Sequence, residues 1–109
     1  MSKLSRDKGA RYEREIAHRY RDAGFTDAYR TAQFCGNTGH AADVEGVPGV
    51  HIEGKHQERL RLYEWIEQAE RDAAGSGKIP AVHRRKNRRE SLVTLRLNDF
   101  IELIKKAQI

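Results

Sequence analysis

The chain has 109 residues, of which 34% are charged and 38% hydrophobic, and its formal net charge at pH 7 is +5. This length suits one domain with one modest core, and no apolar run approaches the roughly 20 residues of a membrane span. Cys35 is the only cysteine, which excludes an intrachain disulfide and a cysteine zinc site. We expect the protein to work in a reducing cytoplasm, because it has a single cysteine and its N-terminus lacks the apolar segment of a signal peptide.

The first half of the chain predicts one helix followed by short strands. Apolar residues recur at helical spacing over about 7–23, with Asp7 suited to the N-cap and Gly24 to the C-terminal stop. The predicted buried stripe of this helix is Tyr12, Ile16, Tyr20 and Ala23. Strands are expected at 26–31, 42–45 and 50–56, with a polar loop at 34–40 and a Gly/Pro turn at 45–49.

The second half predicts a helix, a hairpin and a last helix. A helix over about 60–74 would bury Leu62, Ile66, Ala69 and Ala73, and Gly75-Ser76-Gly77 would end it. The hairpin has arms at 79–85 and 91–97, with Ser91, Val93, Leu95 and Leu97 on one face. Asn98 or Asp99 would cap the last helix, which would turn Phe100, Ile101, Leu103, Ile104 and Ala107 inward. This order predicts an α/β domain with a mixed five-stranded sheet flanked by helices.

Asp43 and the run Glu53-Gly54-Lys55 form the most informative pattern in the chain. The Gly/Pro turn separates them, so two carboxylates and an amine are expected at adjacent strand ends. Two hard oxygen donors close together suit Mg²⁺, and a neighbouring lysine can orient a water or offset charge on a phosphate. Phosphodiester hydrolysis needs these groups.

The excess positive charge is concentrated in residues 83–89. This run, His83-Arg84-Arg85-Lys86-Asn87-Arg88-Arg89, holds five cations and no acid, and the remaining 16 basic residues balance the 16 acidic ones. Such a concentration favours a polyanion partner. The alternative is an ordinary solvated hairpin tip.

On the basis of these residues, the chain resembles the PD-(D/E)XK nuclease superfamily, and within it the archaeal and phage Holliday junction resolvases. Asp43 matches the motif aspartate, Glu53 the motif glutamate and Lys55 the motif lysine. The run from Lys8-Gly9 to Glu13-Arg14-Glu15 is similar to the opening of the resolvase branch, which places Glu13 where the family has a helix-borne acid. Gly24-Phe25 and Arg30 also match, so the likeness covers about residues 8–85 of a chain that we expect to be one nuclease domain, 1–109.

The resemblance implies a restriction-endonuclease-like fold and a Mg²⁺-dependent DNA endonuclease that resolves four-way junctions as a homodimer, with Mn²⁺ as a substitute ion. The implied catalytic residues are Glu13, Asp43, Glu53 and Lys55, and the implied metal ligands are Asp43, Glu53, Glu13 and the Gly54 carbonyl. The expected DNA-binding residues are Lys8, Arg14, Arg30, Arg84, Arg85, Lys86, Arg88 and Arg89. If the chain is phage-encoded, its cytoplasm would be that of a bacterial host.

Two positions differ from the pattern of the family, and several other side chains need a separate interpretation. Ala42 replaces the motif proline, which is not a ligand, and Gly54 stands where this branch often has an apolar residue. His40 and His51 are interpreted as polar contacts, because their spacing offers no nitrogen-ligand pattern, and Cys35 as an ordinary loop residue. Gln68 is a further candidate for the active site.

The sequence leaves the substrate and the assembly open. Besides junction resolution, the same residues suit a general or restriction-like DNA endonuclease, or a non-catalytic DNA-binding module with the same fold. The complete set of three acids and a lysine argues against the last. Leu60, Tyr63 and Trp65 on the second helix, with Phe100 and Ile104 on the last, are candidate dimer contacts; the alternative is that they fill the monomer core.

Overall fold

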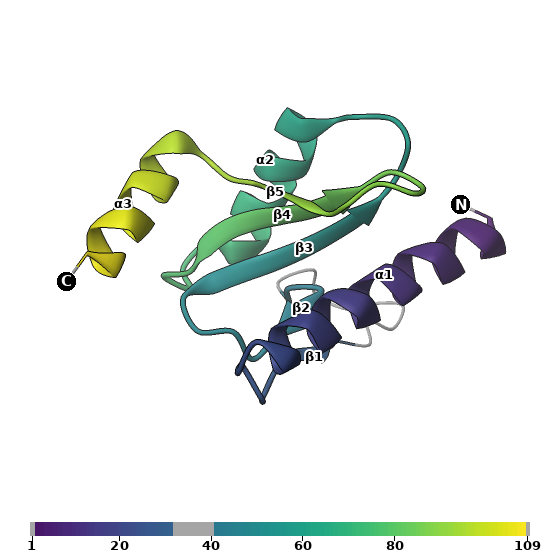
Figure 1. Ribbon diagram of the computed structural model, residues 1–109. Helices are drawn as coiled ribbons and strands as arrows, with labels where there is room; N and C mark the ends of the chain where they lie inside the picture. The colour runs from purple at the N-terminus through teal and green to yellow at the C-terminus, as the bar shows by residue number, and fades with distance from the viewer. Residues whose placement is uncertain (1, 32–40, 109) are drawn as a thin grey trace.

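The computed structural model describes residues 2–31 and 41–108, which form five strands and three helices (Figure 1). In chain order these are α1 (Lys3–Asp22), β1 (Tyr29–Arg30), β2 (Val44–Glu45), β3 (Val50–His56), α2 (Leu62–Ala73), β4 (Ile79–Arg85), β5 (Leu92–Thr94) and α3 (Leu97–Ala107). The sheet has the order β1-β2-β3-β4-β5. The β3–β4 pair is parallel and the other pairs are antiparallel, so the predicted mixed five-stranded sheet is confirmed.

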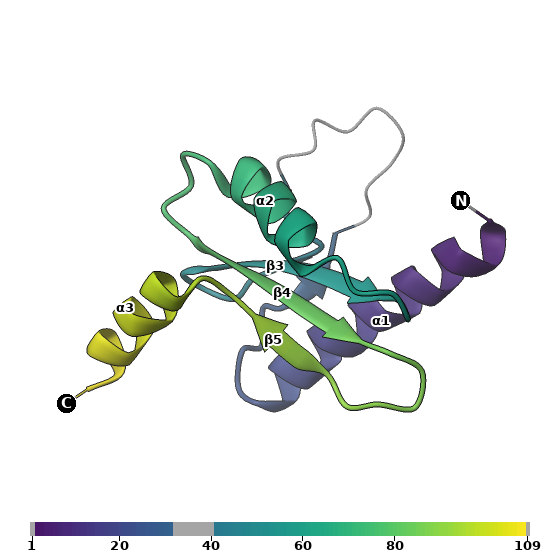
Figure 2. The same ribbon diagram turned by 90° about the horizontal axis from the view of Figure 1, so that it is seen from above.

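Two helices cover opposite faces of the sheet, as Figure 2 shows from above. α1 packs over β1–β3 through a buried cluster that includes Tyr12, Ile16 and Ile52. α2 crosses from the end of β3 to the start of β4 and packs its own cluster, Trp65, Ile66 and Ala69, on Val82. The core is therefore divided between the two faces, with β3 and β4 in the centre.

The predicted helix and strand positions are largely confirmed, although their ends differ. α1 begins at Lys3 because the side chain of Ser2 caps it by accepting from the Ser5 amide at 3.1 Å, so Asp7 is not the cap. Gly24 follows the helix with a φ of +110°, as its predicted role at the stop requires. The strand predicted at 26–31 is reduced to Tyr29–Arg30, and the loop predicted at 34–40 lies outside the described residues.

The prediction for the last helix is wrong in its packing. No residue of α3 is buried, and Leu97, Phe100, Ile101 and Ile104 are exposed. Leu97 starts the helix instead of ending the hairpin arm, and Arg96, with no side-chain capping bond, occupies the N-cap position predicted for Asn98 or Asp99. Only Leu95 and Arg96 separate β5 from α3, and α3 projects past the end of the sheet (Figure 1).

Within the described ranges, no helix has the length and apolar character needed to cross a membrane.

Candidate active site

The site forms where β2 separates from β3. The two strands pair at Val44 and Ile52, and the Asp43 amide donates to the Ile52 carbonyl at 2.9 Å. One step further along β3, the Gly54 amide has no strand partner on this side and donates to Oδ2 of Asp43 at 2.8 Å. The Asp43 carboxylate therefore takes the place of a neighbouring strand at the open edge of β3.

The alternation of β3 separates its side chains between the two helices. His51, Glu53 and Lys55 point to the α2 face, while Ile52 and Gly54 face α1. A Cβ on Gly54 would lie 3.0 Å from Cδ1 of Ile16 and 3.5 Å from Cγ of Glu13. The glycine is thus explained by close packing: its missing side chain lets α1 approach β3 and brings Glu13 to the same edge.

Glu13 is held in the site by Arg30. The Arg30 Nε donates to Oε1 of Glu13 at 2.8 Å, and the two side chains are 30% and 17% exposed. Burial raises the pKa of Glu13, and the hydrogen bond and positive charge of Arg30 act against that rise. Arg30 thus partly offsets the charge of this carboxylate.

Asp43 is the most strongly perturbed carboxylate of the site. Burial raises its pKa from 3.8 to about 8, and the negative charges of Glu53 and Glu13 add to the rise. The hydrogen bond from Gly54 acts in the opposite direction. Two carboxyls with raised pKa values, Glu13 and Asp43, beside a third acid at one strand edge are typical of a site that works with a positive partner.

Gln68 of α2 and His51 of β3 contact the other two motif side chains. Nζ of Lys55 donates to Oε1 of Gln68 at 3.3 Å, so the helix residue considered from sequence does reach the site. Oε1 of Glu53 lies 2.8 Å from Nε2 of His51, and both residues are buried. His51 is thus a polar contact, as interpreted from sequence, whereas His40 and Cys35 lie outside the described residues.

These groups line an open groove of about 680 Å³. Its floor holds Glu13, Asp43, Glu53, Gly54 and Lys55, and its rim includes Arg6, Lys8 and Arg59. Arg6, Arg59 and Asp72 were missed by the sequence reasoning. The spacing of Asp72, one helical turn after Gln68, and the position of Arg59 just after β3 were the available signals.

The comparisons with known proteins agree with this geometry. Residues 4–109 match the model of a family described as "Phage putative PDDEXK endonuclease". The chain belongs to this family. Among solved structures, Hjc from Archaeoglobus fulgidus, a Holliday junction resolvase from an archaeal hyperthermophile, matches with a TM-score of 0.61 over 80% of this chain and 76% of its own, at 24% identity. That likeness shows the fold, and no curated protein sequence matches the chain.

The donor set of this PDDEXK endonuclease fits a hard divalent cation. Asp43 and Glu53 supply carboxylate oxygens, and the raised pKa of Asp43 reflects a charge that a cation would relieve. The Gly54 amide points to the open edge toward Asp43. Because the N–H and C=O of one extended residue point to the same side, the Gly54 carbonyl faces that edge too.

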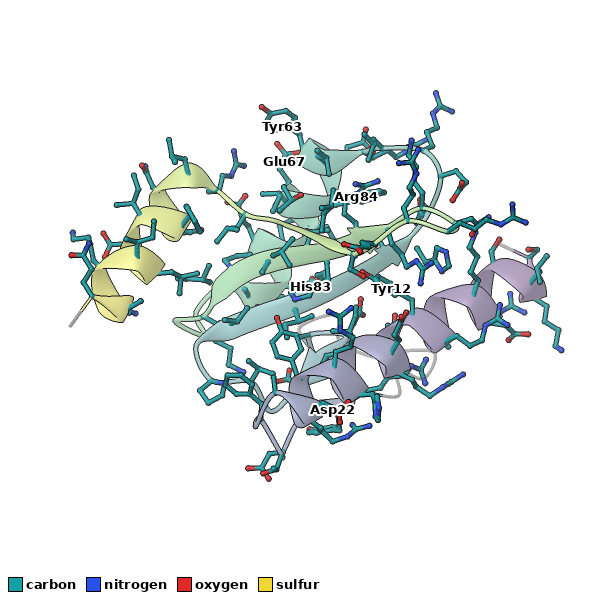
Figure 3. All side chains as sticks on the ribbon, in the orientation of Figure 1. Tyr12, Asp22, Tyr63, Glu67, His83 and Arg84 are labelled. Atoms are coloured by element: carbon teal, nitrogen blue, oxygen red, sulfur yellow. The ribbon has the colours of Figure 1, made fainter. Side chains whose placement is uncertain are left out.

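The expected DNA-binding residues of the PDDEXK endonuclease do not form one surface. Strand alternation turns His83 toward α1 and Arg84 toward α2 (Figure 3), and both are buried. Arg85 pairs with Glu15 of α1 at 3.4 Å, and Arg30 pairs with Glu13. Lys8 lines the groove, while Arg14 is exposed on α1 away from it. Three cations of the run are exposed in the β4–β5 turn: Lys86, Arg88 and Arg89.

Proposed function

We propose that this PDDEXK endonuclease cuts four-way DNA junctions in a Mg²⁺-dependent reaction, as a homodimer that makes paired incisions. The observation that carries the proposal is the meeting of Glu13, Asp43, Glu53 and Lys55 around one open strand edge, in a groove with a basic rim. The carboxylates suit a cation, and the rim suits the phosphates of the substrate.

Asp43, Glu53 and the Gly54 carbonyl would hold the ion, and Glu13 would complete the set directly or through water. When bound, Mg²⁺ lowers the pKa of a coordinated water and stabilises charge that develops on the phosphate. Lys55, held by Gln68 at 3.3 Å, orients the attacking water and offsets negative charge on the phosphoryl oxygens. Attack in line with the leaving 3′ oxygen would give a 5′-phosphate and a 3′-hydroxyl.

The direct test compares a labelled four-way junction with a linear duplex of the same sequence, in Mg²⁺ and in EDTA. We expect junction cleavage in Mg²⁺ or Mn²⁺, none in EDTA, and binding without turnover in Ca²⁺, which coordinates loosely. Full activity in excess EDTA would end the proposal of a metal-dependent nuclease. Equal cleavage of junction and duplex would favour a general DNA endonuclease.

The roles of the individual residues can be tested separately from substrate choice. Asp43→Asn, Glu53→Gln and Lys55→Ala should each lower the cleavage rate by orders of magnitude and leave DNA affinity in Ca²⁺ nearly unchanged. Glu13→Gln should also lower cleavage. A variant with the wild-type rate would remove that residue from the mechanism. A folded wild-type protein that binds DNA but cleaves none would favour the non-catalytic module.

A homodimer is proposed because two symmetric cuts need two sites, and two-fold symmetry supplies them. The apolar residues available for contact are exposed on α2, on α3 and just before α2: Tyr63, Phe100, Ile104 and Leu60. Trp65 is 5% exposed and belongs to the monomer core, so it leaves the candidate set. Light scattering at micromolar concentration should report about twice the chain mass of 12.5 kDa. A monomer with and without junction DNA would contradict the homodimer.

A further inference from the structure

The Glu53 carboxylate is held by a histidine that does not itself line the groove. His51 and Glu53 are 2% and 3% exposed, and Nε2 of the histidine lies 2.8 Å from Oε1 of the glutamate. An ionised carboxylate only accepts hydrogen bonds, so the histidine nitrogen is the donor. A buried contact of this length to a charged acceptor restricts the rotation of the carboxylate.

α2 places Asp72 close to this pair. A carboxylate oxygen of Asp72, a ring nitrogen of His51 and a carboxylate oxygen of Glu53 all lie within 4.8 Å of one another. Asp72 follows Gln68 by one helical turn, on the same side of α2, and Gln68 contacts Lys55. One face of α2 therefore lies beside both motif residues of β3, with Gln68 next to Lys55 and Asp72 next to His51 and Glu53, and both α2 residues line the groove.

We propose that His51, supported by Asp72, is a positioning residue that fixes Oε1 of Glu53 and leaves Oε2 to the divalent cation. A ligand restrained in this way loses less rotational freedom when it binds an ion than one that turns freely. The three side chains could instead be a separate transition-metal site. The existing contact argues against an ion at Nε2, because the nitrogen that donates a proton to Glu53 has no lone pair.

This inference rests on the proposed nuclease site, and its test is built on a pair of substitutions at one position. His51→Gln keeps an N–H donor at a similar reach, whereas His51→Leu keeps volume and removes the donor. Ile66→Ala is the matched control, because it loosens the packing of α2 on the sheet from the buried cluster around Val82. The three readouts are the Mn²⁺ dissociation constant by calorimetry on DNA-free protein, the single-turnover cleavage rate at saturating DNA, and DNA affinity in Ca²⁺.

We expect His51→Leu to weaken Mn²⁺ binding and slow cleavage by about 10–100-fold, the usual effect of removing a residue that orients a metal ligand. DNA affinity should stay within about twofold, since the groove rim is untouched. His51→Gln should recover most of both losses. Asp72→Asn should weaken Mn²⁺ binding less than His51→Leu does, and should add nothing in the His51→Leu background, because the two residues act in sequence.

Several results would overturn the inference. One is Mn²⁺ affinity and cleavage at wild-type level in His51→Leu; another is an equal loss in Ile66→Ala at equal thermal stability. A second bound Zn²⁺ or Ni²⁺ ion that disappears in both His51→Gln and Asp72→Asn would identify a separate metal site instead. If His51→Leu does not fold, His51→Gln and Asp72→Asn decide, and wild-type Mn²⁺ affinity in Asp72→Asn would refute the support from α2. Failure of wild-type protein to cleave any DNA would contradict the proposed function and not this role of His51.

Discussion

Replacing Asp43 by asparagine should stabilise the metal-free protein above neutral pH. The folded protein raises the pKa of this carboxyl from 3.8 to about 8, so between these values the folded state binds more protons than the unfolded state. Stability then falls as the pH rises, by up to about 1.4 kcal/mol per pH unit, and the loss is complete above the folded pKa. Asparagine stays neutral and still accepts the hydrogen bond from Gly54.

The shift sets an upper limit of about 6 kcal/mol, at about 1.4 kcal/mol per pKa unit. Because the groove is open to water, which screens part of the repulsion, we expect on the order of 2 kcal/mol at pH 9. For a domain of this size that corresponds to a rise of roughly 8 °C in melting temperature. At pH 5 the folded carboxyl is protonated and only part of this loss is present, so the difference between the two proteins should be much smaller than at pH 9. It should vanish only below the unfolded pKa of 3.8.

The assay is thermal unfolding in EDTA between pH 5 and pH 9, followed by the fluorescence of Trp65, the only tryptophan and a buried one. Asp22→Asn is the control, since it removes an acid whose side chain is 70% exposed and far from the groove. Saturating Mn²⁺ should raise the melting temperature of wild type more than that of Asp43→Asn. A pH-independent difference between Asp43→Asn and wild type would refute the reasoning, as would a wild-type protein that gains stability toward pH 9 relative to this variant.

Three further predictions follow from the packing. Gly54→Ala should slow cleavage and lower the free energy of unfolding by about 1 kcal/mol, because the new Cβ would press on Ile16. Adding Ile16→Val should restore both the cleavage rate and the melting temperature, whereas no effect of Gly54→Ala would contradict the close approach of α1. Arg88→Gly should raise the free energy of unfolding by about 1 kcal/mol, since Arg88 has a φ of +61°. It should also lower DNA affinity and reduce the slope of log affinity against log salt concentration by about 0.9. An unchanged slope would show that the turn faces away from DNA. A chain that stops at Arg96 should keep its melting temperature within a few degrees, because no residue of α3 is buried, but it should become a monomer by light scattering. A large drop in melting temperature would show that α3 supports the monomer fold.

The sequence predicted the sheet and the two packed helices because local patterns determine both. Strand alternation, the turn at 45–49 and the helical spacing of Tyr12 and Ile16 need no long-range information. The meeting of Asp43, Glu53 and Lys55 followed from a short turn between adjacent strands. Glu13 could be placed only through the family resemblance, because its contact with this edge depends on how closely α1 approaches Gly54.

What the sequence did not predict depends on contacts between distant elements. The apolar stripe of α3 indicates an amphipathic helix, but periodicity does not say what covers the apolar face. The basic run appeared to be one surface, whereas strand alternation and a pairing with Glu15 remove Arg84 and Arg85 from it. The support of Glu53 by His51 and Asp72 requires knowing that α2 lies across β3.

The hydrogen bond between Asp43 and the Gly54 amide has a consequence for solubility. An unpaired strand edge is a template on which another chain can add a strand, and proteins commonly block such edges with charge. Here the blocking group is a carboxylate of the candidate active site, which occupies the one amide that an incoming strand would need next to Ile52. Inactive protein for binding studies is therefore better made with Asp43→Asn, which keeps the edge capped, than with Asp43→Ala, which opens it to aggregation.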